Sequence, residues 1–148
     1  MEQRSPARRK ARAIALQVLY EIDGARHDRH RALERRLQDG PLSPSVQAFA
    51  SQIIDGVIDS RDKIDSIIST YAPTWPISQM AVVDRNLLRV AIFEMVFGGA
   101  TPPKVAINEA VELGKIFGSD ASPKFVNGVL GSVMDSGMVE GEGDVASN

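Results

Sequence analysis

The sequence lacks cysteine and contains only two histidines among its 148 residues. The absence of cysteine excludes disulfide bonds, thiolate nucleophiles and cysteine-ligated zinc sites. Two histidines are too few for most metal sites and acid–base pairs. We therefore expect no enzymatic activity, no metal and no cofactor. No apolar run approaches the roughly 18 residues of a membrane span, and no hydrophobic segment follows the basic N-terminus. We therefore expect a cytoplasmic protein with neither a membrane span nor a signal peptide.

Charge is distributed unevenly along the chain, although the formal net charge is only −2. Residues 1–36 hold 10 basic and 5 acidic residues, a net charge of +5. Residues 37–134 hold 7 basic and 10 acidic residues (−3), and the segment from Asp135 to Asn148 holds four acids and no base (−4). This asymmetry predicts an N-terminal region that binds an anion and a solvated acidic tail.

Apolar residues in the N-terminal half recur at the three- and four-residue spacing of one face of a helix. We predict helices over residues 11–22, 28–38 and 44–71. Ser43 followed by Pro44 is typical of an N-cap with proline at the first helical position. The long stripe that follows predicts one helix, with a bend near Gly56 or Ser60.

The C-terminal half shows the same helical periodicity. We predict helices over residues 79–97, 102–117 and 122–135. Ser122 followed by Pro123 repeats the cap-plus-proline pattern and marks the start of the last helix. No alternating strand pattern flanked by hairpin turns occurs in the sequence. The predicted fold class is therefore all-α.

The connections between these helices predict two helical subdomains, a three-helix N-terminal lobe packed on a C-terminal helical bundle. A joint between Pro73 and Pro76 separates them, and we expect Trp75 in this joint to be wedged between the lobes. The alternative is that Trp75 is exposed and functional. The predicted boundaries are a flexible basic N-terminus at residues 1–7, subdomains at 8–72 and 77–135, and a disordered acidic tail at 136–148.

Two pairs of side chains have spacings that a metal or a catalytic site could use. His27 and His30 are three residues apart on a predicted helix, but no third histidine and no cysteine completes a metal site, so a solvated surface is expected. Glu109 and Glu112 have the same spacing, and Lys115 follows them, which favours charge pairing on the helix surface. Neither pair predicts an enzyme.

The N-terminal helix carries the strongest indication of a partner. Arg8, Arg9, Lys10 and Arg12 crowd into little more than one turn, at the end where the helix dipole disfavours positive charge. A cluster placed there predicts contacts to an external polyanion, with an affinity that falls as salt is raised. Tyr20 lies opposite the apolar face of this helix and either stacks on an unpaired RNA base or packs half-buried between helices.

A second candidate site lies at the start of the last predicted helix. Free backbone N–H groups, Lys124 and the aromatic edge of Phe125 would together suit a nucleotide. The alternative is that Phe125 caps the hydrophobic core. Taken with the N-terminal cluster, these residues predict a helical domain that binds RNA.

Four segments of the sequence resemble the NusB family of bacterial transcription antitermination factors. They are Arg8–Tyr20, Asp84–Arg89, Val105–Leu113 and Lys124–Leu130, in a NusB-like helical domain over residues 8–135. The resemblance implies an all-helical fold of two subdomains and a non-enzymatic role. It also implies binding of boxA, a short single-stranded element of ribosomal RNA leader transcripts, together with the ribosomal protein NusE. With other Nus factors, that pair makes RNA polymerase resistant to termination.

The resemblance also assigns roles to individual residues. It implies phosphate contacts from the arginine-rich turn, an RNA path beside Tyr20, and aromatic and polar contacts from the C-terminal half. The implied RNA-binding residues are Arg8, Arg9, Lys10, Arg12, Tyr20, Asp84, Phe117, Lys124 and Phe125. Ala121 departs from the family, in which an acid is frequent, and Pro123 replaces a residue that is polar in some relatives. The expected core residues are Leu87, Leu88, Val126 and Val129.

Other interpretations stay open at the level of sequence. The protein is either an RNA-binding factor whose affinity its protein partner completes, or mainly a helical docking module in which RNA contact is secondary. In the second case the face of Asn108, Glu109 and Glu112 and the acidic tail carry the interaction. A homodimer that hides the arginine face, as some members of the family form, is a further alternative.

Overall fold

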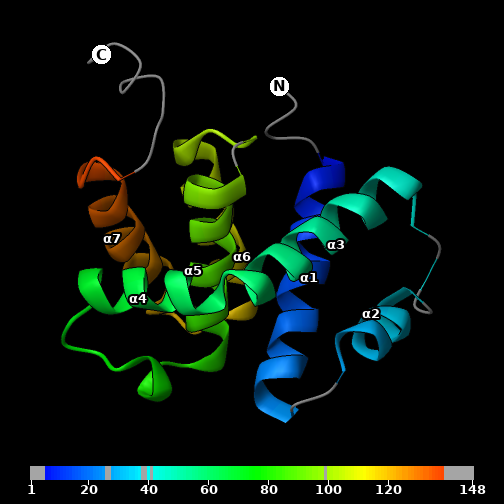
Figure 1. The fold of residues 1–148 in the computed structure, drawn as a ribbon, viewed down its shortest axis with the longest axis horizontal. Helices are drawn as coiled ribbons and strands as arrows, with labels where there is room; N and C mark the ends of the chain where they lie inside the picture. Colours follow the sequence, from blue (N-terminus) through cyan, green and yellow to red (C-terminus); the bar gives the residue numbers. More distant parts are fainter. Residues whose placement is uncertain (1–5, 26–27, 38–39, 41, 99, 139–148) are drawn as a thin grey trace.

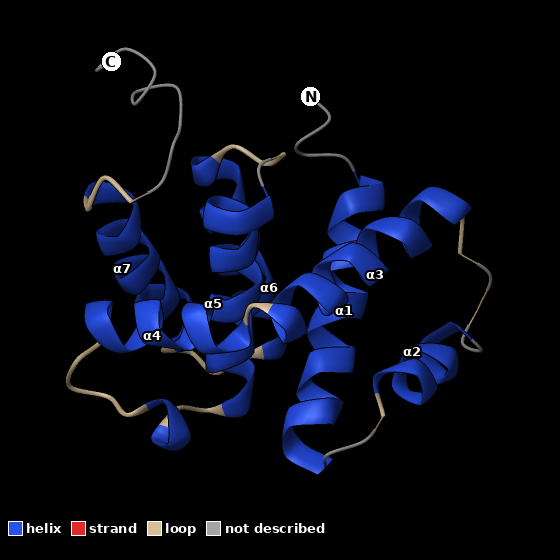
Figure 2. Ribbon diagram, viewed as in Figure 1, coloured by secondary structure: helices blue, strands red, loops and turns tan. Residues whose placement is uncertain are grey.

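The computed structural model describes residues 6–25, 28–37, 40, 42–98 and 100–138. Every element of regular secondary structure in these ranges is helical, which confirms the all-α prediction (Figure 1, Figure 2). The α-helices are α1 (Pro6–Ala25), α2 (Arg29–Leu37), α3 (Pro44–Asp59), α4 (Arg61–Tyr71), α5 (Val82–Ile92), α6 (Pro103–Phe117) and α7 (Ser122–Asp135). A 3₁₀ turn, η2 (Ile77–Gln79), precedes α5, and a π-helical turn, η3 (Phe93–Gly98), follows it. None of the described helices is long and apolar enough to cross a membrane.

The helix predicted over residues 44–71 is interrupted at Ser60, so the predicted bend near Gly56 or Ser60 is confirmed, but the single helix is wrong because the chain forms two, α3 and α4. Ser60 has φ −107° and ψ 15°, outside the helical region, while its N–H still bonds to the carbonyl of Gly56 at 3.0 Å. The start is as predicted, since the hydroxyl of Ser43 accepts a hydrogen bond from the N–H of Val46 at 3.3 Å. The break lets α3 pack against α1 while α4 packs against α5 and α7.

The helix predicted over residues 79–97 begins only at Val82, because the two residues before it have extended backbones. Its C-terminal end widens into η3, which buries Phe93 and Glu94. The ring of Phe93 lies so close to Gly56 of α3 that a methyl group added there would overlap it. Because η3 buries the charged side chain of Glu94, this glutamate requires a partner of opposite charge in the interior.

A continuous hydrophobic core runs through the molecule and joins the two predicted subdomains. α1 packs against both α3 and α5, and α6 packs against α5 and α7 (Figure 1). The sequence-predicted core is confirmed, since all four of its residues are buried: Leu87, Leu88, Val126 and Val129. The N-terminal and C-terminal halves therefore share one interior.

Some predictions fall at the limits of the described residues. α1 begins at Pro6, so the helix includes the last two residues of the N-terminus that we expect to be flexible, residues 1–7. Residues 139–148 of the acidic tail, His27 and the side chain of His30 lie outside the described part of the chain. The boundary between subdomains at residues 72–77 stays a prediction.

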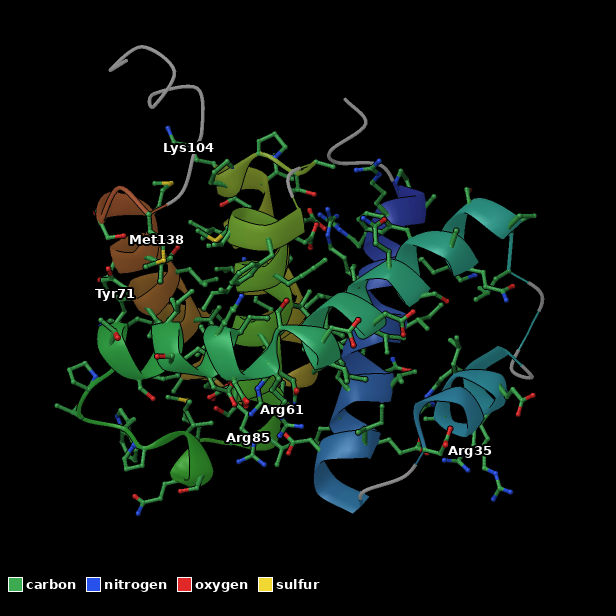
Figure 3. All side chains as sticks on the ribbon, in the orientation of Figure 1. Arg35, Arg61, Tyr71, Arg85, Lys104 and Met138 are labelled. Carbon is green, nitrogen blue, oxygen red and sulfur yellow. The ribbon has the colours of Figure 1, made fainter. Side chains whose placement is uncertain are left out.

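A network of ion pairs joins α1, α4 and α5. Asp23, near the end of α1, accepts two hydrogen bonds from Arg85 (labelled in Figure 3), at 2.7 and 2.9 Å. Asn86 and Arg89 each donate one more to the same carboxylate, at 2.9 Å. Arg89 also donates to Asp65 of α4, at 2.8 and 3.0 Å. Burial alone would raise the pKa of Asp23, but the hydrogen bonds and the two arginine charges outweigh it and lower the pKa from 3.8 to about 2.

Candidate nucleic-acid interface

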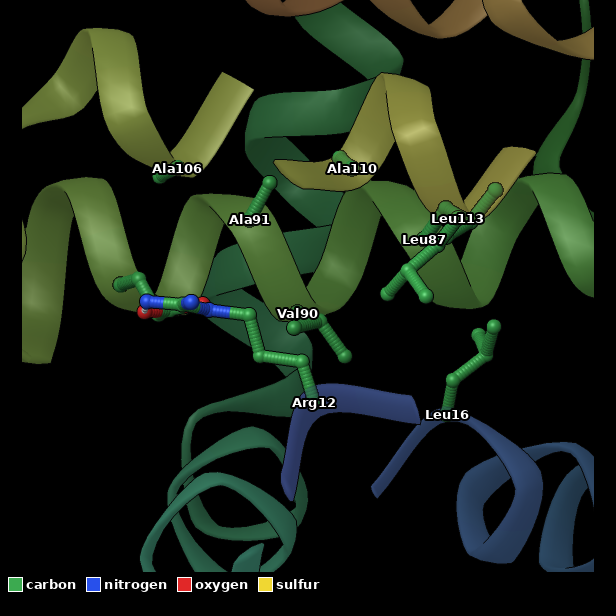
Figure 4. A pocket seen from close by; sticks show the side chains of 9 residues that line it. Arg12, Leu16, Leu87, Val90, Ala91, Ala106, Ala110 and Leu113 are labelled. Atoms are coloured by element: carbon green, nitrogen blue, oxygen red, sulfur yellow. Dashed lines mark hydrogen bonds and ion pairs between the residues drawn. The ribbon is translucent and has the colours of Figure 1, made fainter. Parts of the chain in front are cut away.

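Arg12, which the sequence predicts to contact RNA phosphates, is buried, with 1% of its surface exposed. Its Nε and Nη2 atoms donate to the two carboxylate oxygens of Glu94, both at 2.8 Å, and the hydroxyl of Thr101 donates to the same carboxylate at 2.7 Å. Figure 4 shows the Arg12 side chain reaching from α1 toward α5, beside Val90 and Ala91. The predicted phosphate contact of Arg12 is therefore wrong in this structure, because Glu94 matches its charge in the interior.

Arg9 also binds a carboxylate, although half of its side chain stays exposed. It donates two hydrogen bonds to Glu109 of α6, at 2.9 and 2.8 Å, and these bonds and the charge of Glu109 raise the pKa of Arg9. The sequence pattern places Glu109 on a solvated face, but it is 3% exposed and its Oε1 lies 3.9 Å from Nη1 of Arg12. That prediction is wrong, because α1 covers Glu109 and supplies two guanidinium groups to it.

The other cations of the first turns point to different neighbours. The guanidinium of Arg8 lies over the ring of Phe49 in α3, 4.7 Å from its centroid, and lines a hollow between the two helices. Lys10 is exposed. The arginine-rich turn is therefore not a single phosphate-binding patch, because Arg9 and Arg12 face glutamates and Arg8 stacks on a neighbouring helix.

Tyr20 and Phe117 come together at the surface, from α1 and from the end of α6. Their side chains are 49% and 36% exposed, and both line a pocket of about 240 Å³. Gln17, about one turn before Tyr20, and Arg36 of α2 line the same pocket. Exposed aromatic rings with polar groups beside them offer both stacking surface and hydrogen bonds to an unpaired base. Of the two interpretations of Tyr20, this geometry favours the exposed one.

Asp84 and Phe125 line a second pocket, of about 290 Å³. Each pocket has one wall at the start of α5, where Val83 lines the first and Asp84 lines the second. Trp75, expected to be wedged between the lobes, is 52% exposed and lines this second pocket. That expectation is wrong, because about half of the Trp75 residue is open to solvent and α4 packs against α5 and α7 without it. Lys124 is exposed beside Phe125.

The loop between α6 and α7 connects to the second pocket through Ser122. The hydroxyl of Ser122 accepts a hydrogen bond from the N–H of Ser119 at 2.9 Å and donates one to Asp84 at 2.6 Å. The prediction of Ser122 as the cap of α7 is wrong, because its hydroxyl closes the preceding loop while Ala121 occupies the N-cap position. Phe125 packs partly against the core, as one interpretation predicts, and also lines the pocket, while its contact with a nucleotide stays a prediction.

Three polar residues of the two pockets are absent from the sequence-based candidates: Gln17, Arg36 and Gln79. Gln17 follows from helical periodicity, since it lies three residues before Tyr20 on the same side of α1. Arg36 and Gln79 lie on α2 and η2, and only the tertiary structure places these elements beside the aromatic rings.

Known proteins match this chain over most of its length. A family model described as the NusB family matches residues 9–135. A transcription antitermination protein NusB from Chloroflexus aggregans is 45% identical over 137 residues, which cover 91% of this chain and 91% of the relative. The protein of the same name from Dehalococcoides mccartyi is 46% identical over 127 residues, which cover 86% of this chain and 89% of the relative.

Solved structures share the fold. T. maritima NusB superposes with a TM-score of 0.81 at 33% identity, over 88% of this chain and 92% of that chain. A crystal structure of antitermination factors NusB and NusE in complex with dsRNA also gives a TM-score of 0.81, at 26% identity, over 88% of this chain and 97% of that chain. Since the family model spans most of the chain and two relatives are 45% and 46% identical over nearly their whole length, this protein belongs to the NusB family of transcription antitermination proteins.

Proposed function

We propose that this protein binds a boxA-type single-stranded element of ribosomal RNA leader transcripts together with the ribosomal protein NusE. The assembly acts with RNA polymerase and other Nus factors to make transcription processive. The observation that carries the proposal is the pair of exposed aromatic rings, Tyr20 and Phe117, which line one surface pocket. Membership of the NusB family and the solved complex of NusB and NusE with dsRNA support it.

Binding involves no covalent chemistry, so the surface has to supply stacking, hydrogen bonds and positive charge. Unpaired bases stack on the two exposed rings. Lys10, Lys124 and the exposed part of Arg9 contact phosphates. Arg12 acts only indirectly, because its buried ion pair holds α1, which carries Tyr20, against η3 at the C-terminal end of α5.

The direct test is fluorescence anisotropy of a labelled boxA-like RNA, with and without NusE and at several ionic strengths. We expect binding that NusE strengthens and that weakens as salt is raised, because phosphate contacts release counterions. A scrambled RNA of the same length and composition is the control. Equal affinity for the two RNAs in the presence of NusE would refute the proposal.

Neutralising exposed lysines should weaken RNA binding in a salt-dependent way. We expect Lys10→Gln and Lys124→Gln each to reduce the affinity several-fold and to reduce the slope of log affinity against log salt by about 0.7, the value for one phosphate contact on a single strand. Lys63→Gln is the matched control, since Lys63 is exposed on α4 and lines neither pocket. An equal effect of all three substitutions would mean that only net charge matters.

Tyr20→Ala is expected to weaken binding of the boxA-like RNA roughly tenfold, because one base–aromatic stack contributes about 1–3 kcal/mol. Tyr20→Phe keeps the ring and should retain most of the affinity. Since Tyr20 is 49% exposed, neither variant should unfold at a much lower temperature, which circular dichroism checks. Wild-type affinity of Tyr20→Ala in the anisotropy assay would remove this ring from the RNA path.

The alternative function is a docking module in which RNA contact is secondary. Its surface is smaller than the sequence suggests, because Glu109 is buried and leaves Asn108 and Glu112 on that face. Capture of NusE that needs no RNA, combined with no measurable RNA affinity in any mixture, would favour docking.

Sedimentation of the free protein and of its mixture with RNA tests the homodimer alternative. A homodimer that hides the RNA-binding surface should dissociate when RNA binds.

A further inference from the structure

Trp75 is the sole tryptophan of the chain and stands at the surface in the connection between α4 and α5. Its side chain is 52% exposed, and its backbone N–H donates to the carbonyl of Ala72 at 3.2 Å. Pro73 and Pro76 flank it and restrict the backbone of the connection. Trp75 is the largest of the exposed apolar side chains in the described part of the chain and leaves a broad aromatic face in water. The local backbone therefore presents the ring to solvent.

The pocket beside Trp75 combines aromatic rings with polar groups. Phe125 lines it from α7, and Gln79 and Asp84 line it from η2 and α5. The hydroxyl of Ser122 donates a hydrogen bond to Oδ1 of Asp84 at 2.6 Å. The other carboxylate oxygen, Oδ2, accepts no hydrogen bond from the described residues. A carboxylate repels phosphate but accepts hydrogen bonds from N–H groups. A planar aromatic ligand that carries N–H donors matches this lining.

The position of the pocket favours an RNA base as that ligand. Lys124 is exposed next to Phe125 and supplies a positive charge for a phosphate at the rim. Val83 and Asp84 are consecutive residues, and each lines one of the two pockets. A strand that stacks on Tyr20 in the first pocket would have to cross the start of α5 to reach the second.

We propose that Trp75 is a base-stacking residue, and that it and Phe125 hold an unpaired nucleobase whose amino or imino N–H donates to Asp84. The proposal rests on the proposed function of RNA binding and extends the RNA surface to the connection between α4 and α5. Any base with an N–H donor on its Watson–Crick edge satisfies the carboxylate, while the rings provide the stacking energy.

Because Trp75 is the sole tryptophan of the chain, the tryptophan fluorescence of this protein reports on the surroundings of Trp75 alone. With excitation that tyrosine does not absorb, the fluorescence of Trp75 should be quenched as unlabelled boxA-like RNA is added to the protein with NusE already bound. In parallel, anisotropy of labelled RNA measures affinity. We expect Trp75→Ala to weaken binding about tenfold and Trp75→Phe to bind within about threefold of the wild type, because phenylalanine keeps an aromatic face. Thermal unfolding should be nearly unchanged in both variants, since the ring is exposed.

An abasic scan of the RNA tests the stacked base itself. Replacing each nucleotide in turn by an abasic one should identify one position at which the quenching of Trp75 disappears and at which Trp75→Ala costs no further affinity. RNA that binds in the anisotropy assay without quenching, and equally to Trp75→Ala, would overturn this inference while leaving the proposed function intact. Quenching by NusE alone, with none from RNA, would assign the pocket to the protein partner and also overturn it. Absence of any RNA binding would defeat the proposed function first.

Discussion

Glu94→Ala is expected to lower the free energy of unfolding by about 3–5 kcal/mol, as is typical when one partner of a buried ion pair is removed. Glu94 is 4% exposed and accepts both hydrogen bonds from Arg12, which is 1% exposed. Without this carboxylate the guanidinium stays buried, with Glu109 at 3.9 Å as its nearest acid. The loss is large because the charge has left water and no longer has its close partner. Urea denaturation followed by circular dichroism measures it.

Glu112→Ala is the matched control for this substitution. Glu112 pairs with Lys115 at 3.0 Å on the surface of α6, with side chains 44% and 57% exposed. Exposed pairs contribute at most about 1 kcal/mol, so we expect little change. The double variant Arg12→Met with Glu94→Leu should recover much of the loss, because apolar side chains replace both charges. If Glu94→Ala costs no more than Glu112→Ala, the pair is not buried in solution.

Asp23→Asn is expected to lower the free energy of unfolding by about 2 kcal/mol at neutral pH, since each unit of pKa shift corresponds to about 1.4 kcal/mol. The side chain of Asp23 is 7% exposed, and Arg85 and Arg89 bind it at 2.7 and 2.9 Å. Asparagine keeps the shape and one acceptor oxygen but, like protonated aspartic acid, carries no charge. Thermal or urea denaturation at pH 7 measures the difference.

The same carboxylate makes stability depend on pH. Because the pKa of Asp23 is lower in the folded protein than its ordinary value of 3.8, its contribution is fully present above about pH 4 and is lost as the pH falls to about 2. The wild type should therefore lose about 2 kcal/mol more than Asp23→Asn over this interval. Asp120→Asn, which changes an exposed acid in the loop before α7, should follow the wild type. Parallel pH curves for the wild type and Asp23→Asn would contradict the role of this network.

Helices were predictable where one apolar face repeats without interruption. The polar helix expected over residues 28–38 is α2, Arg29–Leu37, and the last helix, expected over residues 122–135, has the predicted bounds. The pattern predicted a bend near Gly56 or Ser60 but not a division into two helices, because apolar residues continue at helical spacing on both sides of Ser60. Which helices α3 and α4 each pack against decides where the chain turns.

The candidate site was predictable only in part. The position of Tyr20 opposite the apolar face of α1 follows from helical periodicity, which is a local property, but only the structure decided between an exposed and a half-buried ring. The pairing of the arginine cluster with glutamates does not follow from the sequence. Glu94 lies 82 residues from Arg12 along the chain, and Glu109 lies 100 residues from Arg9. The same reason applies to Trp75, whose exposure depends on how closely α4 packs against α5 and α7.

The sequence by itself determined the all-α class, most of the helices, the buried stripes and the family, because each is written in short-range periodicity or in contiguous motifs. Only the tertiary structure decided which charges remain available to a ligand. It buried Arg12 against Glu94, covered Glu109 with Arg9, and brought the exposed rings together at the start of α5. The physical reason is that a charged side chain is neutralised by whatever packing places within a few ångströms of it, and sequence separation carries no information about that distance.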